Sequence, residues 1–169
     1  MDKKVIALLN QQVNKEFFSA YLYLSFANYF ENRGLSGFAN WYLIQAQEER
    51  DHAMLFVKFL QNNDESLIYE AIEKPASTWE NEMEVLKAGL AHEKFITDSI
   101  NKIYATALDL KDFRTTQFLD WFIKEQGEEE TNANELIQQA ELIGKSGNGL
   151  YMLDQKLALR VYAAPSLVL

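Results

Sequence analysis

Residues 48–52, with the sequence EERDH, contain residue types that bind metal ions. Glu49 and His52 are three residues apart, so on a helix their side chains project from one face and can reach the same ion. That face also carries the apolar residues of the segment, which are Phe38, Trp41, Tyr42, Phe56 and Phe59. The pattern therefore predicts a carboxylate and an imidazole in a stripe that faces the protein core.

The same anomaly recurs in three other segments with helical periodicity. Each carries polar side chains in its apolar stripe, near the middle of the segment: Glu16 in the first, Glu93 in the third, and Gln126 with Glu129 in the fourth. In a bundle of helices of similar length, mid-helix positions lie at one height whichever way each helix runs. We therefore expect the polar groups of all four helices to converge on one spot in the core.

Burying these groups has a large electrostatic cost. Moving an isolated carboxylate into a medium of low dielectric costs on the order of 20 kcal/mol in the idealised Born treatment, and still several after relaxation. Without a cation the carboxylates repel one another and take up protons. Two divalent or trivalent metal ions neutralise them, and carboxylate and imidazole ligands favour iron or manganese. The chain has no cysteine, which excludes disulfides, iron–sulfur clusters and thiolate zinc sites.

Further acidic and aromatic residues stand near these positions in the sequence. Tyr23, seven residues after Glu16, either packs in the core with its hydroxyl hydrogen-bonded or reaches the metal ions. The second histidine, His92, is about 100° around the helix from Glu93 and is predicted to lie on the surface. Three more glutamates either line an adjoining, weaker cation site or are solvated: Glu48, Glu125 and Glu128.

Four long segments and one short one have apolar residues spaced three and four apart, as in helices. The first begins near residue 4 and ends near the NRG turn at 32–34, and the others cover 36–62, about 77–110, 112–144 and 150–160. Ser36 is the expected N-cap of the second helix, and Ser77 and Glu80 have the spacing of a capping box at the start of the third.

The connections between these helices predict their directions. Short connections make the first and second helices antiparallel, and likewise the third and fourth. About 16 residues separate the second from the third, and at ~3.3 Å each they can span roughly 50 Å, the length of the bundle. The prediction is an all-α four-helix bundle with a long lengthwise crossover between helices two and three and a short C-terminal fifth helix.

The composition limits the class of protein. At 169 residues the chain is predicted to form one domain over 1–169, with the bundle over about 4–144 and a tail over 161–169. A formal net charge of −9 argues against nucleic acid as a partner and is compatible with cations. The start of the chain lacks the apolar core of a signal peptide, and no apolar run is long enough to span a membrane. We therefore expect a cytoplasmic location and no membrane partner.

These segments together resemble the bacterial non-heme ferritins over nearly the whole chain. The resemblance is carried by NKEFFSAYLYLSFANYF, AQEERDHA, FLDWFIKEQGEEE and GKSGNGLYMLD. It implies the ferritin-like fold and a homo-oligomeric hollow shell of twenty-four subunits. It also implies iron storage and detoxification through ferroxidase activity, in which Fe(II) is oxidised to Fe(III) by O2 or H2O2 and deposited as ferric oxide-hydroxide mineral inside the shell.

The resemblance further implies roles for individual residues, with two irons per subunit at an intrasubunit ferroxidase centre. The first iron is held by Glu16, Glu49 and His52. The second is bridged by Glu49 and held by Glu93 and by either Gln126 or Glu129. Tyr23 corresponds to a tyrosine beside this centre. An additional third iron site of bacterial members corresponds to Glu48, Glu125, Glu128 and Glu129.

Two departures from related families sharpen the resemblance. Bacterioferritins and rubrerythrin-like proteins carry a second Glu-x-x-His on the fourth helix, where this chain has QGEE, from Gln126 to Glu129. Arg50 follows Glu49 at the position that resembles the heme-ligating methionine of bacterioferritins, so no heme is expected. The apolar tail RVYAAPSLVL either packs at an oligomer interface, lies inside a cavity or is disordered.

Two other functions are less favoured by these residues than ferroxidase activity and storage. A di-metal oxidoreductase on the same bundle is expected to hold a stable cofactor, and the missing second Glu-x-x-His is unfavourable to it. A helical scaffold without a redox role leaves the mid-bundle carboxylates unexplained. The predicted function is therefore iron storage with ferroxidase activity.

Overall fold

Most of the residues that the structure describes lie in five helices. The computed structural model describes residues 1–143 and 146–169, and within them the chain contains no strand. The helices are α1 (Lys3–Glu31), α2 (Ser36–Asn62), α3 (Glu82–Asp109), α4 (Phe113–Ile143) and α5 (Gly147–Leu157). None of these helices is both long and apolar enough to cross a bilayer. The predicted all-α four-helix bundle with a short fifth helix is confirmed.

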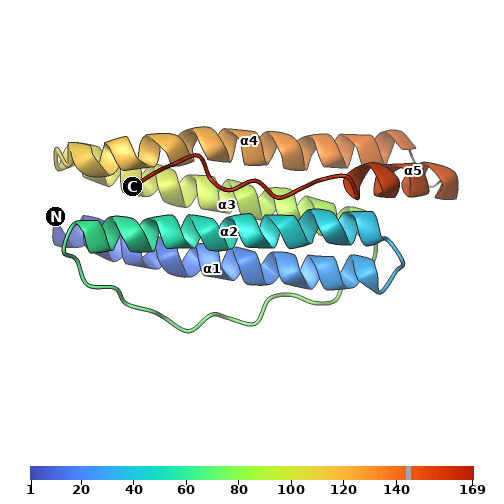
Figure 1. Ribbon diagram of the computed structural model, residues 1–169, viewed down its shortest axis with the longest axis horizontal. Coiled ribbons are helices and arrows are strands. Elements are labelled where there is room, and N and C mark those ends of the chain that lie inside the picture. Colours follow the sequence, from blue (N-terminus) through green and yellow to red (C-terminus); the bar gives the residue numbers. More distant parts are fainter. Residues whose placement is uncertain (144–145) are drawn as a thin grey trace.

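The crossover between α2 and α3 runs the length of the bundle, as Figure 1 shows for the segment below α1 and α2. Two side chains of α1 hold it. The Asn10 amide donates to the Ser66 carbonyl at 3.2 Å and accepts from the Ile68 N–H at 2.7 Å. Farther along α1, the Ser25 hydroxyl donates to the Ala76 carbonyl at 2.6 Å. The crossover is therefore lengthwise, and α3 runs parallel to α2 (Figure 1).

The core consists of two apolar clusters, one around Phe26 and Phe38 and the other around Phe56 and Phe122. On each of the four long helices, the residues of one cluster precede those of the other along the chain. The buried candidate ligands fall between the two clusters, near the middle of each helix: Glu16, Glu49, His52, Glu93, Gln126 and Glu129. A polar layer therefore separates two apolar halves, which places the expected convergence of polar groups at mid-bundle.

The N-terminus of α2 is capped from a distant part of the chain, so the prediction that Ser36 is its N-cap is wrong. Leu35 occupies the cap position and makes no side-chain capping hydrogen bond. The carboxylate of Asp154 on α5 instead accepts from the backbone N–H groups of Gly37 at 2.8 Å and Phe38 at 3.0 Å. A Cβ at Gly37 would lie 1.7 Å from the Asp154 carbonyl oxygen. Only glycine therefore allows α5 to approach this closely.

The start of α3 is also displaced from its prediction. The helix begins at Glu82 rather than near Ser77, because the crossover must travel the length of the bundle first. Its N-cap is Asn81, whose side chain accepts from the Glu84 N–H at 3.0 Å, while the Glu84 carboxylate accepts from the Glu80 N–H at 2.6 Å. The capping expected of Ser77 and Glu80 is thus made later in the chain, by Asn81 and Glu84, although Glu84 accepts from the residue before the cap rather than from the cap itself.

The fifth helix covers Gly147–Leu157, about one turn earlier than the predicted 150–160. Ser146 starts it by accepting from the Gly149 N–H at 3.4 Å. Gly144, the predicted end of the fourth helix, lies outside the described residues.

The chain after α5 continues along the bundle and lies between α2 and α4 in the view of Figure 1. The Tyr162 hydroxyl donates to Asp51 on α2, and the Trp121 indole on α4 donates to the Ser166 hydroxyl at 2.9 Å. Leu167 packs against the apolar cluster around Phe56. The tail therefore packs on the bundle of its own chain, and its placement at an oligomer interface or inside a cavity stays a prediction.

Replacing the distant cap should destabilise the junction of α2 and α5. We expect Asp154→Ala to lower the free energy of unfolding by about 1 kcal/mol, which corresponds to a fall in Tm of about 2–4 °C. Asp154→Asn keeps an acceptor oxygen and should lose less. The control is Asp98→Ala at an exposed position of α3. A melting curve of Asp154→Ala that coincides with wild type would contradict the capping role.

Candidate metal centre

Three side chains from α1 and α2 form a compact group in the polar layer. One ligand atom each from Glu16, Glu49 and His52 lies within 4.8 Å of the others. Their residues are only 1–2% exposed. Among residues 1–143 and 146–169, this is the one group of three or more acidic or histidine side chains with such spacing. The His52 ring is held edge-on against Trp121 and Phe122, with centroids 5.5 and 5.8 Å apart.

Glu93 of α3 enters the same layer from the opposite side of the bundle. Its carboxylate accepts from the Tyr23 hydroxyl and from the Gln126 amide nitrogen at 3.2 Å. A cavity of about 20 Å³ borders Glu93, Tyr23, Glu129 and Gln45. This volume suits a single water-sized group. The structure therefore brings Glu93, Gln126, Glu129 and Tyr23 to one place beside the first group.

Two buried glutamines orient these carboxylates, and the sequence analysis missed both. The Gln12 amide donates to Glu16 at 2.7 Å, and the Gln45 amide donates to Glu49 at 3.2 Å and to Glu129 at 2.7 Å. Each glutamine precedes its glutamate by four residues, so the two share a helix face. The repeated Gln-x-x-x-Glu spacing was the available signal.

One oxygen of the group is left without a partner. Glu16 Oε2 is fully buried and has no hydrogen-bond partner among the described residues. Such an atom costs free energy unless something satisfies it. A cation between Glu16, Glu49 and His52 would do so, and the donor set of two carboxylates and one imidazole suits iron. The residues present therefore fit a bound metal ion.

Burial and mutual repulsion raise the pKa values of three glutamates of this layer. Burial, followed by the charge of Glu49, raises the pKa of Glu16 to about 8. The same two causes raise the pKa of Glu129 to about 8. Burial and the charges of Glu49 and Glu129 raise the pKa of Glu93 well above its usual range. Without a metal, protons hold the charge of this layer down.

Glu49 and His52 form an ion pair, with His52 Nδ1 3.4 Å from Glu49 Oε2. Burial disfavours the charge on His52, but the hydrogen bond and charge of Glu49 outweigh it and raise the pKa of His52 to about 10. Burial likewise opposes the charge on Glu49, but His52 outweighs it and lowers the pKa of Glu49. A metal ion that binds His52 must displace its extra proton.

The remaining predicted glutamates lie at the edge of this layer. Glu48 is mostly buried and its carboxylate lies 2.5 Å from the Arg160 guanidinium. Glu125 is half-buried, whereas Glu128 is exposed and pairs with Lys124 at 3.5 Å. Among the described residues, none of these three glutamates belongs to the candidate metal-binding group of Glu16, Glu49 and His52.

His92 is partly buried, whereas the sequence predicted it on the surface. Its Nε2 lies 2.7 Å from the Ser19 hydroxyl, and its ring contacts Phe18 and Tyr23. The face of α3 next to Glu93 packs against α1, which partly buries this imidazole. Burial lowers the pKa of His92.

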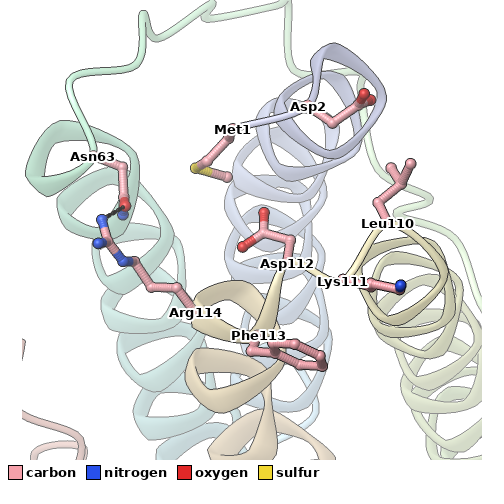
Figure 2. Close-up of a pocket in the computed structure, with 8 residues that line it drawn as sticks. All are labelled: Met1, Asp2, Asn63, Leu110, Lys111, Asp112, Phe113 and Arg114. Atoms are coloured by element: carbon pink, nitrogen blue, oxygen red, sulfur yellow. Dashed lines mark hydrogen bonds between the residues drawn. The ribbon is translucent and has the colours of Figure 1, made fainter.

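A larger pocket, of about 440 Å³, lies at the end of the bundle (Figure 2). In Figure 2, Arg114 points toward Asn63, to which it donates a hydrogen bond of 2.7 Å. The pocket wall includes Asp2, whereas Glu16 is fourteen residues farther along α1, about 20 Å at 1.5 Å per residue. This pocket is therefore separate from the candidate metal-binding group.

The raised pKa values predict how the stability of the metal-free protein depends on pH. The folded state holds the Glu16 and Glu129 protons more tightly than the unfolded state, in which glutamate titrates near 4.5. Their contribution to stability is therefore fully present below about pH 4.5 and is lost as the pH rises through about 8. We expect the Tm of the chelator-treated protein to fall over this range, and the fall to be smaller in Glu16→Gln.

The control for this prediction is Glu135→Gln, at an exposed position of α4. It should follow the wild-type curve of Tm against pH. If Glu16→Gln follows that curve too, Glu16 does not carry a raised pKa in the folded protein.

The chain was compared with known proteins. Residues 6–143 match the family model of the ferritin-like domain. The bacterial non-heme ferritin of Campylobacter jejuni is 36% identical over 155 residues, which are 92% of this chain and 93% of that protein. The bacterial non-heme ferritin of Staphylococcus epidermidis is 34% identical over 162 residues, covering 96% and 98%.

Solved structures agree with the family match. An open pore ferritin from the hyperthermophilic archaeon Archaeoglobus fulgidus superimposes with a TM-score of 0.94 at 38% identity, covering 95% of this chain and 99% of that chain. A humanized archaeal ferritin gives a TM-score of 0.95 at 39% identity, covering 96% and 99%. The family model spans most of the chain, several relatives exceed 30% identity over nearly their full length, and the fold is the same. The chain belongs to the ferritin family.

Proposed function

We propose that this protein stores iron, and that its buried carboxylate–imidazole layer is a ferroxidase centre that oxidises Fe(II) to Fe(III). One observation carries the proposal: Glu16, Glu49 and His52 converge in the core while Glu16 Oε2 lacks a partner among the described residues. Family membership supports storage as the purpose of the oxidation. Iron is thus the substrate and cargo of the site.

Two irons occupy the centre in this proposal. The first is held by Glu16, Glu49 and His52, and the second lies between Glu49, Glu93 and Glu129. The small cavity beside Glu93 and Glu129 supports the second position. Gln126 turns its amide nitrogen, a donor without a lone pair for a metal, toward Glu93. We therefore assign Glu129 as the ligand and Gln126 as a residue that positions Glu93.

The chemistry follows from charge and electron count. Anionic ligands stabilise Fe(III) more than Fe(II), so the carboxylates favour the loss of an electron from each iron. Two Fe(II) ions together supply the two electrons that, with two protons, reduce O2 to H2O2 or H2O2 to two waters. A second site built without a histidine holds its iron less firmly, which suits transfer of the product to a mineral.

Storage requires a cavity that one chain does not enclose, so we propose a homo-oligomeric hollow shell of twenty-four subunits. An exposed apolar groove of about 540 Å³ supports self-association. It is bordered by α1, α2 and the crossover, and its large exposed apolar side chains are Tyr21, Leu24, Leu43 and Ile72. Exposed apolar patches of this kind commonly mark interfaces.

Aerobic addition of excess Fe(II) tests storage and oxidation together. We expect far more than two oxidised irons per chain, in a particle of about twenty-four times the 19.5 kDa chain mass. Glu49→Ala and His52→Ala should slow the initial oxidation at least about tenfold. Glu135→Ala, an exposed control on α4, should not.

Two outcomes contradict the proposal. Oxidation that stops at two irons per chain indicates a di-metal enzyme rather than a store. Wild-type oxidation rates in Glu49→Ala and His52→Ala would falsify the ferroxidase assignment.

Anaerobic Fe(II) binding tests the assignment of the second iron. Glu129→Gln should lower the number of tightly bound Fe(II) ions per chain from two to one. Gln126→Leu, which removes a positioning residue only, should keep both ions with weaker affinity. The opposite pattern, with the second ion lost in Gln126→Leu and retained in Glu129→Gln, makes Gln126 the ligand. Equilibrium dialysis followed by iron analysis gives the count.

A further inference from the structure

Arg160, shortly after the end of α5, lies at the edge of the proposed ferroxidase centre. The backbone that carries it is fixed by Asn40, whose amide donates to the Leu157 carbonyl at 3.3 Å and to the Arg160 carbonyl at 3.1 Å. The Arg160 guanidinium lies over the Trp41 ring, 4.1 Å from its centroid. Arg160 is therefore anchored at both its backbone and its side chain.

The Arg160 guanidinium makes three hydrogen bonds to α2. Nη1 donates to the Gln45 amide oxygen at 3.0 Å and to the Trp41 carbonyl at 3.2 Å. Nη2 donates to Glu48 Oε2 at 2.5 Å. The side chains of Arg160 and Glu48 each keep only 17% of their exposure, so the ion pair is largely out of water. A shielded, charge-assisted contact of this kind is stronger than an exposed one.

The contact with Gln45 has a consequence for the iron ligands. A glutamine amide has one acceptor oxygen and one donor nitrogen, and turning it over exchanges them. Arg160 can only donate, so it holds the Gln45 oxygen outward. The Gln45 nitrogen then faces Glu49 and Glu129, to which it donates. Without Arg160, nothing in this contact prevents the amide from turning its oxygen toward the two carboxylates.

The contact between Arg160 and Glu48 pairs two opposite charges. Glu48 is the residue of the predicted third iron site that lies next to Glu49 in the chain, and its carboxylate is already paired with the Arg160 guanidinium. An iron ion that uses Glu48 must break this ion pair. The guanidinium therefore competes with a third cation for the same carboxylate.

We propose that Arg160 is a built-in counter-ion that keeps a third iron from binding at Glu48, and that it positions Gln45 toward Glu49 and Glu129. This inference rests on the proposed two-iron centre. It gives the C-terminal segment a role in the iron chemistry. The tail contacts of Tyr162 with Asp51 and of Ser166 with Trp121 hold the segment on the bundle.

The test is the number of Fe(II) ions bound per chain under strict anaerobiosis, measured by equilibrium dialysis on the assembled protein. We expect two for wild type, three for Arg160→Gln, and two again for Arg160→Gln combined with Glu48→Gln. The control is Lys124→Gln, which also removes one positive charge from the acidic edge, where Lys124 pairs with Glu128, and should leave two. A melting curve and the particle mass of each variant distinguish a specific gain of binding from binding by a misfolded chain.

The affinity for the first two ions tests the positioning role. Arg160→Gln should weaken their binding about tenfold, the low end of the loss seen when a residue behind a metal ligand is removed. Unchanged affinity contradicts positioning through Gln45. Three ions in wild type, two in Arg160→Gln, or three in the double variant overturn the counter-ion role. If wild type binds no Fe(II) at the centre, it is the two-iron proposal that fails.

Discussion

The structure depends on how the charge of a buried polar layer is neutralised. Four carboxylates and one imidazole lie between two apolar clusters, where an unpaired charge is costly: Glu16, Glu49, Glu93, Glu129 and His52. In the metal-free protein, protons on the glutamates and an imidazolium opposite Glu49 meet that requirement. In the proposed function iron ions meet it better, because each would replace several protons with one site of high positive charge. Metal binding and the protonation of the core are therefore one equilibrium.

Two series of hydrogen bonds hold the proposed ligands in place in the metal-free protein. On the α1 side, Lys15 donates to the Ser99 hydroxyl, Ser99 donates to the Gln12 oxygen, and the Gln12 nitrogen donates to Glu16. On the α2 side, Arg160 donates to the Gln45 oxygen, and the Gln45 nitrogen donates to Glu49. Each series begins at a basic side chain, Lys15 or Arg160, and ends at the carboxylate of a proposed ligand. Ligands supported in this way need little rearrangement when the metal binds.

Helical periodicity accounts for what could be predicted from the sequence. The spacing of Glu16, Glu49, His52 and Glu93 within apolar stripes is local information, because a helix converts spacing into a shared face. The lengthwise crossover was predicted from the number of residues between the second and third helices alone. Features that depend on contacts between distant segments were missed. Asp154 caps α2 across more than a hundred residues, and Arg160 reaches Glu48 over a similar separation. Nothing in the sequence around Gly37 or Glu48 indicates these partners.

The central claim is that iron occupies the polar layer itself. Diffraction at the iron absorption edge, from crystals loaded with Fe(II) under anaerobic conditions, locates iron without assuming its ligands. We expect two anomalous peaks inside each subunit, one among Glu16, Glu49 and His52 and the other among Glu49, Glu93 and Glu129. Iron peaks confined to the surface, with the Glu49–His52 ion pair intact in the core, would contradict it.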